Sequence, residues 1–399
     1  MVCLRWKALR LILSRKLEKT AIVVQYRLLH YRLELFEQLR RACHDRGIRL
    51  EVVVGQATRR ERPRADEGEL SWARKVVNRV WEIGDRDWVW QPLPADLRHA
   101  ELVIVMQESR LLSNYALLLR RALGSDQRVA YWGHGRNFQS QTPSGLRERW
   151  KRFMLTRVDW WFAYTEKSAA LVRAAGYQAE RITCLNNAID SGKFRADLAN
   201  CTDLQLSVAR AELGLALGDS VALFCGSLYS DKRLDLLVSA AELIHGTNPN
   251  FTLLVIGDGP LRPAMQEIAA SRPWIKILGV RKGHEKAIFF RLADVVLNPG
   301  AVGLHIVDAF CAGLVLITTK AAKHGPEVAY LEDGVNGLYA GDTADSYAHA
   351  VLGLLADTER LNGMKRAALA DASRYSLASM VHNFAVGIEK ALAAKEASR

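Results

Sequence analysis

The sequence has little cysteine, and its cysteines lack the spacing that a metal site or a redox motif requires. The six cysteines are scattered, and Cys184, Cys225 and Cys311 lie in apolar runs where a free thiol behaves as a small hydrophobic residue. We therefore expect a reducing compartment and no structural zinc or other metal. Long hydrophobic stretches are also missing, because no run approaches the roughly 18 apolar residues of a membrane span. The apolar fraction of 49% and charged fraction of 25% argue against disorder.

Negative charge is in deficit. The chain has 55 Lys and Arg against 43 Asp and Glu, a formal net charge of +12. Such an excess attracts polyanions, which include nucleic acid, anionic lipid headgroups and pyrophosphate-bearing substrates. The sequence has no zinc-finger spacing, recognition-helix signature or RNA-binding aromatic motif, so nucleic acid is not expected as a partner.

The first twenty residues are basic and partly apolar. Lys7, Arg10, Arg15 and Lys16 interrupt the apolar positions, and no small-residue cleavage site follows, which argues against a secretory signal. Two interpretations stay open: a basic amphipathic segment on an anionic membrane surface, or a frayed and solvated first helix. We expect a cytoplasmic protein, with peripheral attachment to the inner face of the cell membrane under the first interpretation.

Length and periodicity predict two domains. A chain of 399 residues exceeds what one core comfortably organises. Short β-branched runs alternate with amphipathic helical patterns over 21–185 and again over 221–318, which is typical of βα units. The predicted fold class is α/β, with two facing, doubly wound Rossmann-like domains. We expect an N-terminal domain at 1–195, a linker at 196–218, a second domain at 219–375, and a helix at 376–399 that could return to the N-terminal domain.

One stretch does not fit the alternation. Residues 57–95 are irregular and rich in arginine and tryptophan. They are too many for a simple connection. The stretch is either a mobile functional loop or a small insert.

Glycine-bearing turns follow two strands of the second domain. Gly226-Ser227-Leu228 comes directly after a strand at 221–224, and Lys232 follows. Glycine lets the backbone approach a ligand closely, and a lysine can place its charge on a phosphate, although such a turn is more often structural. We interpret the turn at 256–260, which contains Gly257, as mostly architectural, with glycine for the turn and aspartate for capping.

A third turn carries the strongest pattern. A buried strand ends at Asn298-Pro299, and a small-residue loop then opens a helix. Free N–H groups at a helix start bind anions, and small residues let a diphosphate reach them. Asp308, about one turn further on, could accept hydrogen bonds from ribose hydroxyls; the alternative is an ordinary turn with a solvated aspartate. The loop residues expected to bind such a diphosphate are Gly300, Ala301, Val302, Gly303 and Leu304.

Candidate residues of the first domain also follow strands. His134 lies between two glycines after a strand at 129–132 and is closely approachable, although a lone histidine is more often structural. The segment after the first strand is basic and aromatic, and an arginine cluster at a helix start is its structural alternative. The residues expected to face a polar or acidic acceptor are Arg27, His30, Arg32, Glu108 and Arg136.

The order of these pieces resembles the donor-binding domain of glycosyltransferase family 4. The resemblance covers residues 221 to about 342 and includes the run from Glu327 to Asn336-Gly337-Leu338-Tyr339, which is similar to the family's "E…NGLL" ending. Asn187-Ala188-Ile189-Asp190 resembles the family's "NGVD" junction. The resemblance implies a GT-B fold and a retaining, metal-independent transferase without a cofactor, whose nucleotide diphosphate-sugar co-substrate is held mainly by the second domain.

The resemblance also assigns roles to residues. The family's diphosphate-binding Arg and Lys fall on Ser227 and Lys232, and its paired glutamates fall on Gly300 and Asp308. Asp308 can keep the ribose-binding role, but Gly300 supplies no side chain, so the loop amides would carry more of the binding. His134 matches a histidine near the transferred sugar. The expected catalytic residues are therefore His134, Lys232 and Asp308.

The acceptor and the activity itself leave alternatives. The family and the basic charge suggest a saccharide or lipid-linked acceptor in bacterial lipopolysaccharide, capsule or exopolysaccharide biosynthesis, with a small soluble acceptor as the alternative. Two other classes stay open. A sugar-nucleotide epimerase can use the same two-domain fold, and a non-catalytic nucleotide-sugar or polyanion-binding protein would explain both the charge and the missing carboxylate at Gly300.

Overall fold

A computed structural model describes residues 19–64, 66–135 and 153–394 of the chain. The chain forms two compact units, of which the first combines the sequence up to Asn186 with the segment from Ala378 onward. The second unit is Asn187–Leu377. Among the described helices, none combines the length and the apolar character needed to cross a membrane.

The second unit is built on a six-stranded parallel sheet with the order β12-β11-β10-β13-β14-β15. The order reverses between β10 and β13, which are neighbours in the sheet. In doubly wound folds, ligands bind outside the carboxyl ends of the strands at such a reversal. The strands are β10 (Ser220–Cys225), β11 (Phe251–Ile256), β12 (Ile275–Gly279), β13 (Val295–Leu297), β14 (Val315–Thr319) and β15 (Gly337–Ala340).

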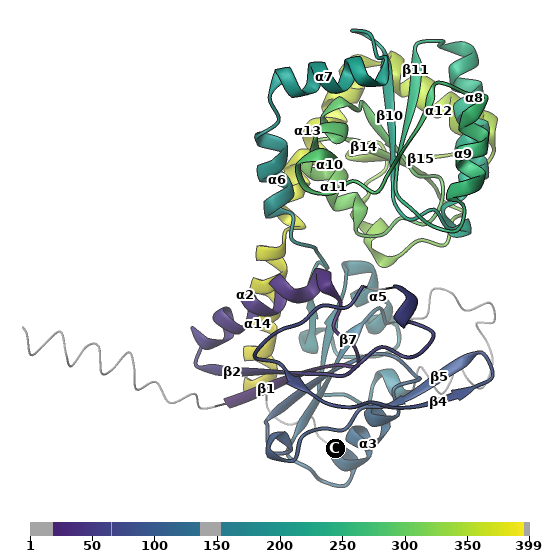
Figure 1. Cartoon of the computed structure of the whole chain (residues 1–399). Helices are drawn as coiled ribbons and strands as arrows, with labels where there is room; N and C mark the ends of the chain where they lie inside the picture. The colour runs from purple at the N-terminus through teal and green to yellow at the C-terminus, as the bar shows by residue number, and fades with distance from the viewer. Residues whose placement is uncertain (1–18, 65, 136–152, 395–399) are drawn as a thin grey trace, which may run out of the picture. The chain divides into compact units, whose positions relative to one another are not determined.

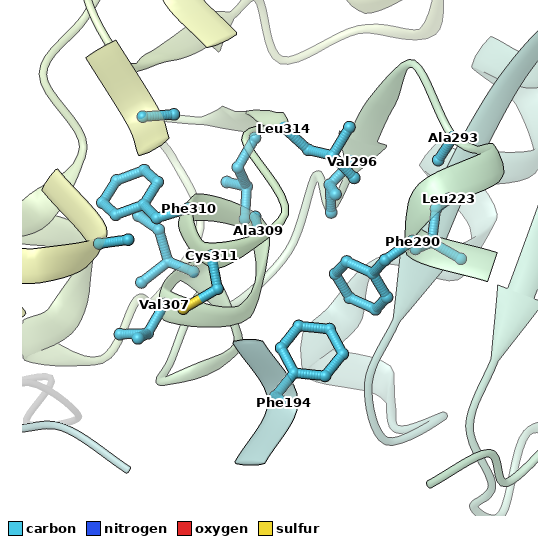
Figure 2. Close-up of a cluster of buried hydrophobic side chains, with 14 of the residues drawn as sticks. Phe194, Leu223, Phe290, Ala293, Val296, Val307, Ala309, Phe310, Cys311 and Leu314 are labelled. Atoms are coloured by element: carbon cyan, nitrogen blue, oxygen red, sulfur yellow. The ribbon is translucent and has the colours of Figure 1, made fainter. Parts of the chain in front are cut away.

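Alternate side chains of these strands pack on opposite faces of the sheet, because successive residues of a strand point to opposite sides. On one face Leu223 and Val296 join Phe194 and Phe290, as Figure 2 shows. On the other face Phe224 and its neighbours contact a second helical layer. The helices of this unit are α6 (Gly192–Ala199), α7 (Asp203–Leu213), α8 (Leu234–Thr247), α9 (Arg262–Ala270), α10 (Gly283–Leu292), α11 (His305–Cys311), α12 (Ala344–Ala356) and α13 (Thr358–Arg374).

The segment expected to be a linker, 196–218, is helical and belongs to the second unit. Thr202 begins α7 with a capping box, in which its side chain accepts from the N–H of Gln205 while Gln205 accepts from the backbone of Thr202. The helix ends at Gly214, whose φ of 70° is the left-handed conformation of a helix end. The division of the chain therefore falls at Asn186, before the predicted boundary.

The first unit has a seven-stranded parallel sheet with the order β3-β2-β1-β6-β7-β8-β9. Its order reverses between β1 and β6, so the loops after these two strands lie at the reversal point. Helices α2 (Leu33–His44), α3 (Leu112–Ala122) and α5 (Glu166–Ala174) connect its strands. The strands are β1 (Lys19–Gln25), β2 (Ile48–Val54), β3 (Arg74–Lys75), β6 (Leu102–Met106), β7 (Arg128–Gly133), β8 (Trp160–Ala163) and β9 (Ile182–Cys184).

The irregular stretch 57–95 is an insert with its own strands. It contributes β3 to the sheet and also forms an antiparallel hairpin of β4 (Arg79–Ile83) and β5 (Arg86–Trp90). Figure 1 shows this hairpin at the edge of the first unit. Of the two interpretations from the sequence, the structure matches the small insert.

The last helix, α14 (Leu377–Ala393), packs on the first unit. The ring of Phe384 lies 5.0 Å from that of Trp132 and 4.8 Å from that of Phe162, centroid to centroid. The carbonyl of Leu392 accepts hydrogen bonds from Lys19, at 3.0 Å, and from Arg128, at 2.7 Å. The chain thus crosses from the first unit to the second and back again (Figure 1).

Candidate active site

Lys232 ends a short 3-10 turn, Ser230–Lys232, that follows β10 at the reversal point of the second sheet. The ammonium group of this half-buried side chain donates to the carbonyl of Ala301. Burial lowers the pKa of Lys232 below its ordinary value, because desolvation disfavours the charged form. In the described part of the chain, no carboxylate lies within ion-pair distance of its Nζ. The structure therefore places a desolvated cation with only a carbonyl partner at this edge.

The loop after β13 packs directly on the Lys232 turn. The N–H of Ala301 donates to the carbonyl of Asp231 at 2.8 Å. A Cβ atom added at Gly300 would meet the Lys232 carbonyl carbon at 2.3 Å and the Asp231 oxygen at 2.4 Å. Both are backbone atoms, so position 300 has no room for a side chain in this conformation. The two backbones thus approach closely at the position on which the resemblance to glycosyltransferase family 4 places a glutamate.

Two of the predicted donor amides are already engaged within the protein. Ala301 donates as described, and the N–H of Val302 donates to Nδ1 of His324 at 3.1 Å. The other ring nitrogen of His324 lies 2.6 Å from the carbonyl of Thr319, which accepts from it. No hydrogen bond among the described residues uses the N–H of Gly303 or Leu304, and both residues are half-buried. The N–H of Gly300 is likewise unused within the described residues, but Gly300 is buried, so the half-buried amides left for a ligand are those of Gly303 and Leu304.

Buried side chains fix the shape of this loop. Thr319 is fully buried and its hydroxyl donates to the Pro299 carbonyl at 2.9 Å. The amide of Asn298 donates to the carbonyl of Ala301 at 3.1 Å and lies 2.8 Å from Nε2 of His305. Desolvation, followed by the charge of nearby Lys232, lowers the pKa of His305 to about 3. His305 is therefore a neutral acceptor that holds the loop at neutral pH.

Asp308 lies in α11 and is buried, with an ion-pair partner that the sequence did not suggest. Lys286, in α10, donates to Oδ2 of Asp308 at 2.6 Å. Burial raises the pKa of the Asp308 carboxyl, and Lys286 opposes that shift. The Lys286 ammonium also lies 4.6 Å from the centroid of the Phe194 ring. Asp308 is therefore not a free carboxylate, because Lys286 is paired with it.

The remaining donor-site predictions are backbone positions. Gly226 and Gly257 touch, because a Cβ added at Gly257, whose φ is 148°, would lie 1.8 Å from the Gly226 carbonyl oxygen. The N–H of Leu228 donates to the Asp258 carbonyl at 2.8 Å and joins the same two turns. Ser227 is exposed beside them. These turns fix the carboxyl edge of β10 and β11 next to Lys232, which agrees with an architectural role for Gly257.

His134 follows β7 in the first unit and is half-buried against an aromatic ring. Its imidazole centroid lies 4.3 Å from that of Tyr164. Burial and the charge of Arg32 lower its pKa to about 4. Arg32 is itself buried, donating to Tyr164 at 2.7 Å and to Gln25 at 2.6 Å. The structure thus places Arg32 behind His134, where it acts on the imidazole rather than presenting its own donors to an acceptor.

A charged network that the sequence did not predict joins the loops after β1 and β6. Tyr26 donates to Glu61 at 2.9 Å and accepts from Arg110 at 2.6 Å. Arg110 also pairs with Glu108 at 2.8 Å, and Glu108 is half-buried. Burial and the charge of Glu108 raise the pKa of Tyr26 to about 12. Glu61 comes from the insert at 57–95, whose irregular pattern gave no indication of its place.

The other acceptor predictions divide. Arg27 is buried and pairs with Asp66 at 2.6 Å. His30 is exposed, and its Nδ1 lies 3.0 Å from the Asp66 carbonyl. Arg136 lies outside the described residues. Glu108 and His30 are thus the predicted acceptor residues with exposed surface.

The search for metal-binding groups covers the described residues only. Among them, no group of three or more His, Cys, Asp and Glu side chains could hold a metal ion.

Comparisons with known proteins match this geometry. Residues 219–357, which carry the Lys232 turn and Asp308, match the family model "Glycosyl transferases group 1". D-inositol 3-phosphate glycosyltransferase of Nocardia farcinica is 29% identical over 84% of this chain and 79% of its own length. Alpha-monoglucosyldiacylglycerol synthase of Acholeplasma laidlawii is 28% identical, but the match covers only 38% of each chain.

Solved structures share the fold of the whole chain. Anabaena Alr3699/HepE in complex with UDP-glucose superposes with a TM-score of 0.63, at 18% identity, over 93% of this chain and 99% of its own. The two parallel-sheet Rossmann-like domains and the returning C-terminal helix are those of GT-B glycosyltransferases, as the sequence predicted.

Proposed function

We propose that this protein is a glycosyltransferase that takes a sugar from a nucleotide diphosphate-sugar. One observation carries the proposal: the match to group 1 glycosyl transferases covers a sheet reversal at which the Lys232 cation has no carboxylate partner among the described residues. The similarity to glycosyltransferases of Nocardia and Acholeplasma supports it. The fold shared with a UDP-glucose complex is consistent with a UDP-linked donor.

The proposed donor site uses the second unit. Lys232 and the N–H groups of Gly303 and Leu304 hold the diphosphate, and Asp308, kept near Lys286, accepts from the ribose. The bond between the anomeric carbon and the diphosphate breaks, and these donors stabilise the charge on the leaving group. The acceptor hydroxyl then bonds through its oxygen to the anomeric carbon on the same face and gives its proton to the departing diphosphate, without a metal ion.

His134 serves the reaction as a neutral group. A pKa of about 4 leaves its imidazole uncharged at neutral pH, so it orients a sugar hydroxyl by accepting its hydrogen bond. His134 follows β7, and the charged network of Tyr26, Glu61 and Arg110 lies at the ends of β1 and β6 in the same sheet, so this edge suits a polar acceptor. We propose a saccharide or lipid-linked acceptor of an envelope polysaccharide pathway.

A thermal-shift panel with UDP, GDP and ADP, followed by a donor-release assay, tests the proposal. A diphosphate that binds the folded state raises its melting temperature. Replacing Lys232 by Met removes a charged contact, so we expect the affinity for that diphosphate to fall by about tenfold or more. Lys276→Met, at the amino end of β12 and thus at the opposite edge of the sheet, is the matched control.

The assay separates the competing classes. A transferase releases the diphosphate slowly from its sugar donor, and faster once the acceptor is present. An epimerase converts the donor alone without releasing the diphosphate. Nucleotide binding without any turnover would refute the proposal that the protein is an enzyme. Equal nucleotide affinity in the Lys232 and Lys276 variants would refute the proposed donor site.

A further inference from the structure

The β4–β5 hairpin exposes one face that is mostly aromatic and apolar, with an arginine at each end. Its register pairs Arg79 with Trp90, Trp81 with Trp88 and Ile83 with Arg86, so these six side chains share one side of the ribbon. Trp81 is 46% exposed and Ile83 is 64% exposed. We call these six residues the hairpin face.

The other side of the hairpin is fixed to the first unit. Val89 is fully buried, and its N–H donates to the carbonyl of Arg110 at 3.0 Å. Asp87 is also buried and pairs with Arg60 at 3.5 Å. The ribbon therefore packs with one side only, and its exposed side is presented to solvent by a rigid support. An apolar partner can therefore cover the exposed tryptophan and isoleucine side chains without disturbing the packing of the hairpin on the first unit.

The two charged residues of the hairpin face are both arginines, whereas the exposed acidic residues Glu82 and Asp85 lie on the opposite side of the ribbon and in its turn. Arg79 and Arg86 are exposed at opposite ends of the face, and no ion pair or hydrogen bond from either side chain occurs within residues 19–64, 66–135 and 153–394. Arg79 and Trp90 also line an open hollow of about 620 Å³ beside the hairpin, together with Lys75 and Leu93. The face thus combines cations with large apolar side chains that water solvates poorly.

We propose that the hairpin face docks this chain on the surface of an anionic lipid bilayer. Tryptophan is favoured at the level of lipid headgroups, where its ring meets both apolar chains and polar groups. Arginine at the rim pairs with lipid phosphates while its stem covers apolar surface. The exposed Ile83, and Val77 at 76% exposure, fit an acyl boundary better than a sugar ring, which needs only flat aromatic platforms.

Vesicle binding by the full chain tests the inference. We expect the protein to co-sediment with phosphatidylcholine vesicles that contain phosphatidylglycerol, and more weakly with phosphatidylcholine alone. Trp81→Ser with Ile83→Ser is expected to lower partitioning by about tenfold or more, since each buried apolar side chain contributes substantially. Arg79→Gln with Arg86→Gln is expected to lower it by about 25-fold on anionic vesicles only, at roughly fivefold per arginine.

The control removes equally exposed apolar side chains elsewhere. Leu204 and Val208 lie on α7 in the second unit, at 74% and 48% exposure, and Leu204→Ser with Val208→Ser is expected to bind vesicles like the unchanged protein. The basic residues 1–20 are present in every variant, so their contribution is common to all. Thermal melting confirms that each variant is folded.

The outcomes decide between occupants. Loss of vesicle binding in both hairpin variants, with the control unchanged, supports membrane docking. Unchanged vesicle binding in the hairpin variants overturns it. Unchanged vesicle binding combined with weakened binding of a soluble oligosaccharide also overturns it, and identifies the face as a saccharide platform. Vesicle binding does not depend on sugar transfer, so failure here leaves the proposed function untouched.

Discussion

Replacing Gly300 by alanine tests the contact between the loop after β13 and the Lys232 turn. The added Cβ would lie 2.3–2.4 Å from backbone atoms of Lys232 and Asp231, whereas ordinary contacts begin at 3.4 Å. The loop must therefore move by about 1 Å, which costs about 1–3 kcal/mol by overpacking. That shift also breaks the hydrogen bond from Ala301 to Asp231, which is worth about 1 kcal/mol.

The expected loss is about 3 kcal/mol of unfolding free energy for the second unit, or roughly 6–12 °C in melting temperature for a unit of this size. Denaturant melts and thermal scans measure it, and nucleotide affinity should fall with it because Lys232 is displaced. Gly303→Ala is the control, since a Cβ there meets nothing within 4 Å. If Gly300→Ala is as stable as Gly303→Ala and binds nucleotide equally well, the close approach of the two backbones is refuted.

Three further predictions follow from the charged groups. Lys286→Met leaves the buried Asp308 carboxylate unpaired and should cost about 3–5 kcal/mol in a denaturant melt, while the double variant with Asp308→Leu should recover most of that loss; an unrecovered double variant contradicts the pairing. The pKa values of His134 and His305, about 4 and about 3, lie below the ordinary 6.5, so the folded state binds these protons less tightly than the unfolded chain. The free energy of unfolding therefore has its full value above pH 6.5 and decreases as the pH is lowered, by about 1–2 kcal/mol per histidine between pH 7 and 5. His305→Gln should flatten the dependence of the melting temperature on pH. Arg32→Met should raise the His134 pKa, which NMR titration measures, and an unchanged pKa would show that burial alone sets it.

Most of the fold could be predicted because its strands are buried on both faces. Such strands are continuous apolar runs, and elements such as strand β8 and helix α3 realise the alternation predicted over 21–185. Helix α7 was not predicted, because it buries only Ala209 and the sequence therefore has no apolar stripe there. The β4–β5 hairpin was not predicted, because apolar residues lie on its exposed side and the usual alternation of buried apolar and exposed polar residues is absent.

The candidate site could be predicted where it depends on the order of strands and not where it depends on tertiary contacts. Lys232 and the loop at 298–304 follow β10 and β13, and their neighbourhood follows from the topology of a doubly wound sheet. Lys286 comes from a helix whose pattern suggests only packing, so its pairing with Asp308 needed the structure. Glu61 lies in the irregular insert, and nothing local places it beside Tyr26.

The glycine at 300 and the unpaired lysine at 232 are best understood as one feature. Lys232 is desolvated, which lowers its pKa below the ordinary value, and among the described residues its ammonium has the carbonyl of Ala301 as its one hydrogen-bond partner. A carboxylate at position 300 would stand beside this ammonium and neutralise it, but the two backbones leave no room for one. Under the proposed function, a diphosphate replaces the Ala301 carbonyl as the partner of Lys232. A diphosphate adds the attraction of opposite charges to the hydrogen bond, whereas a carbonyl offers only a dipole, so the exchange favours the ligand most where no carboxylate competes for the cation.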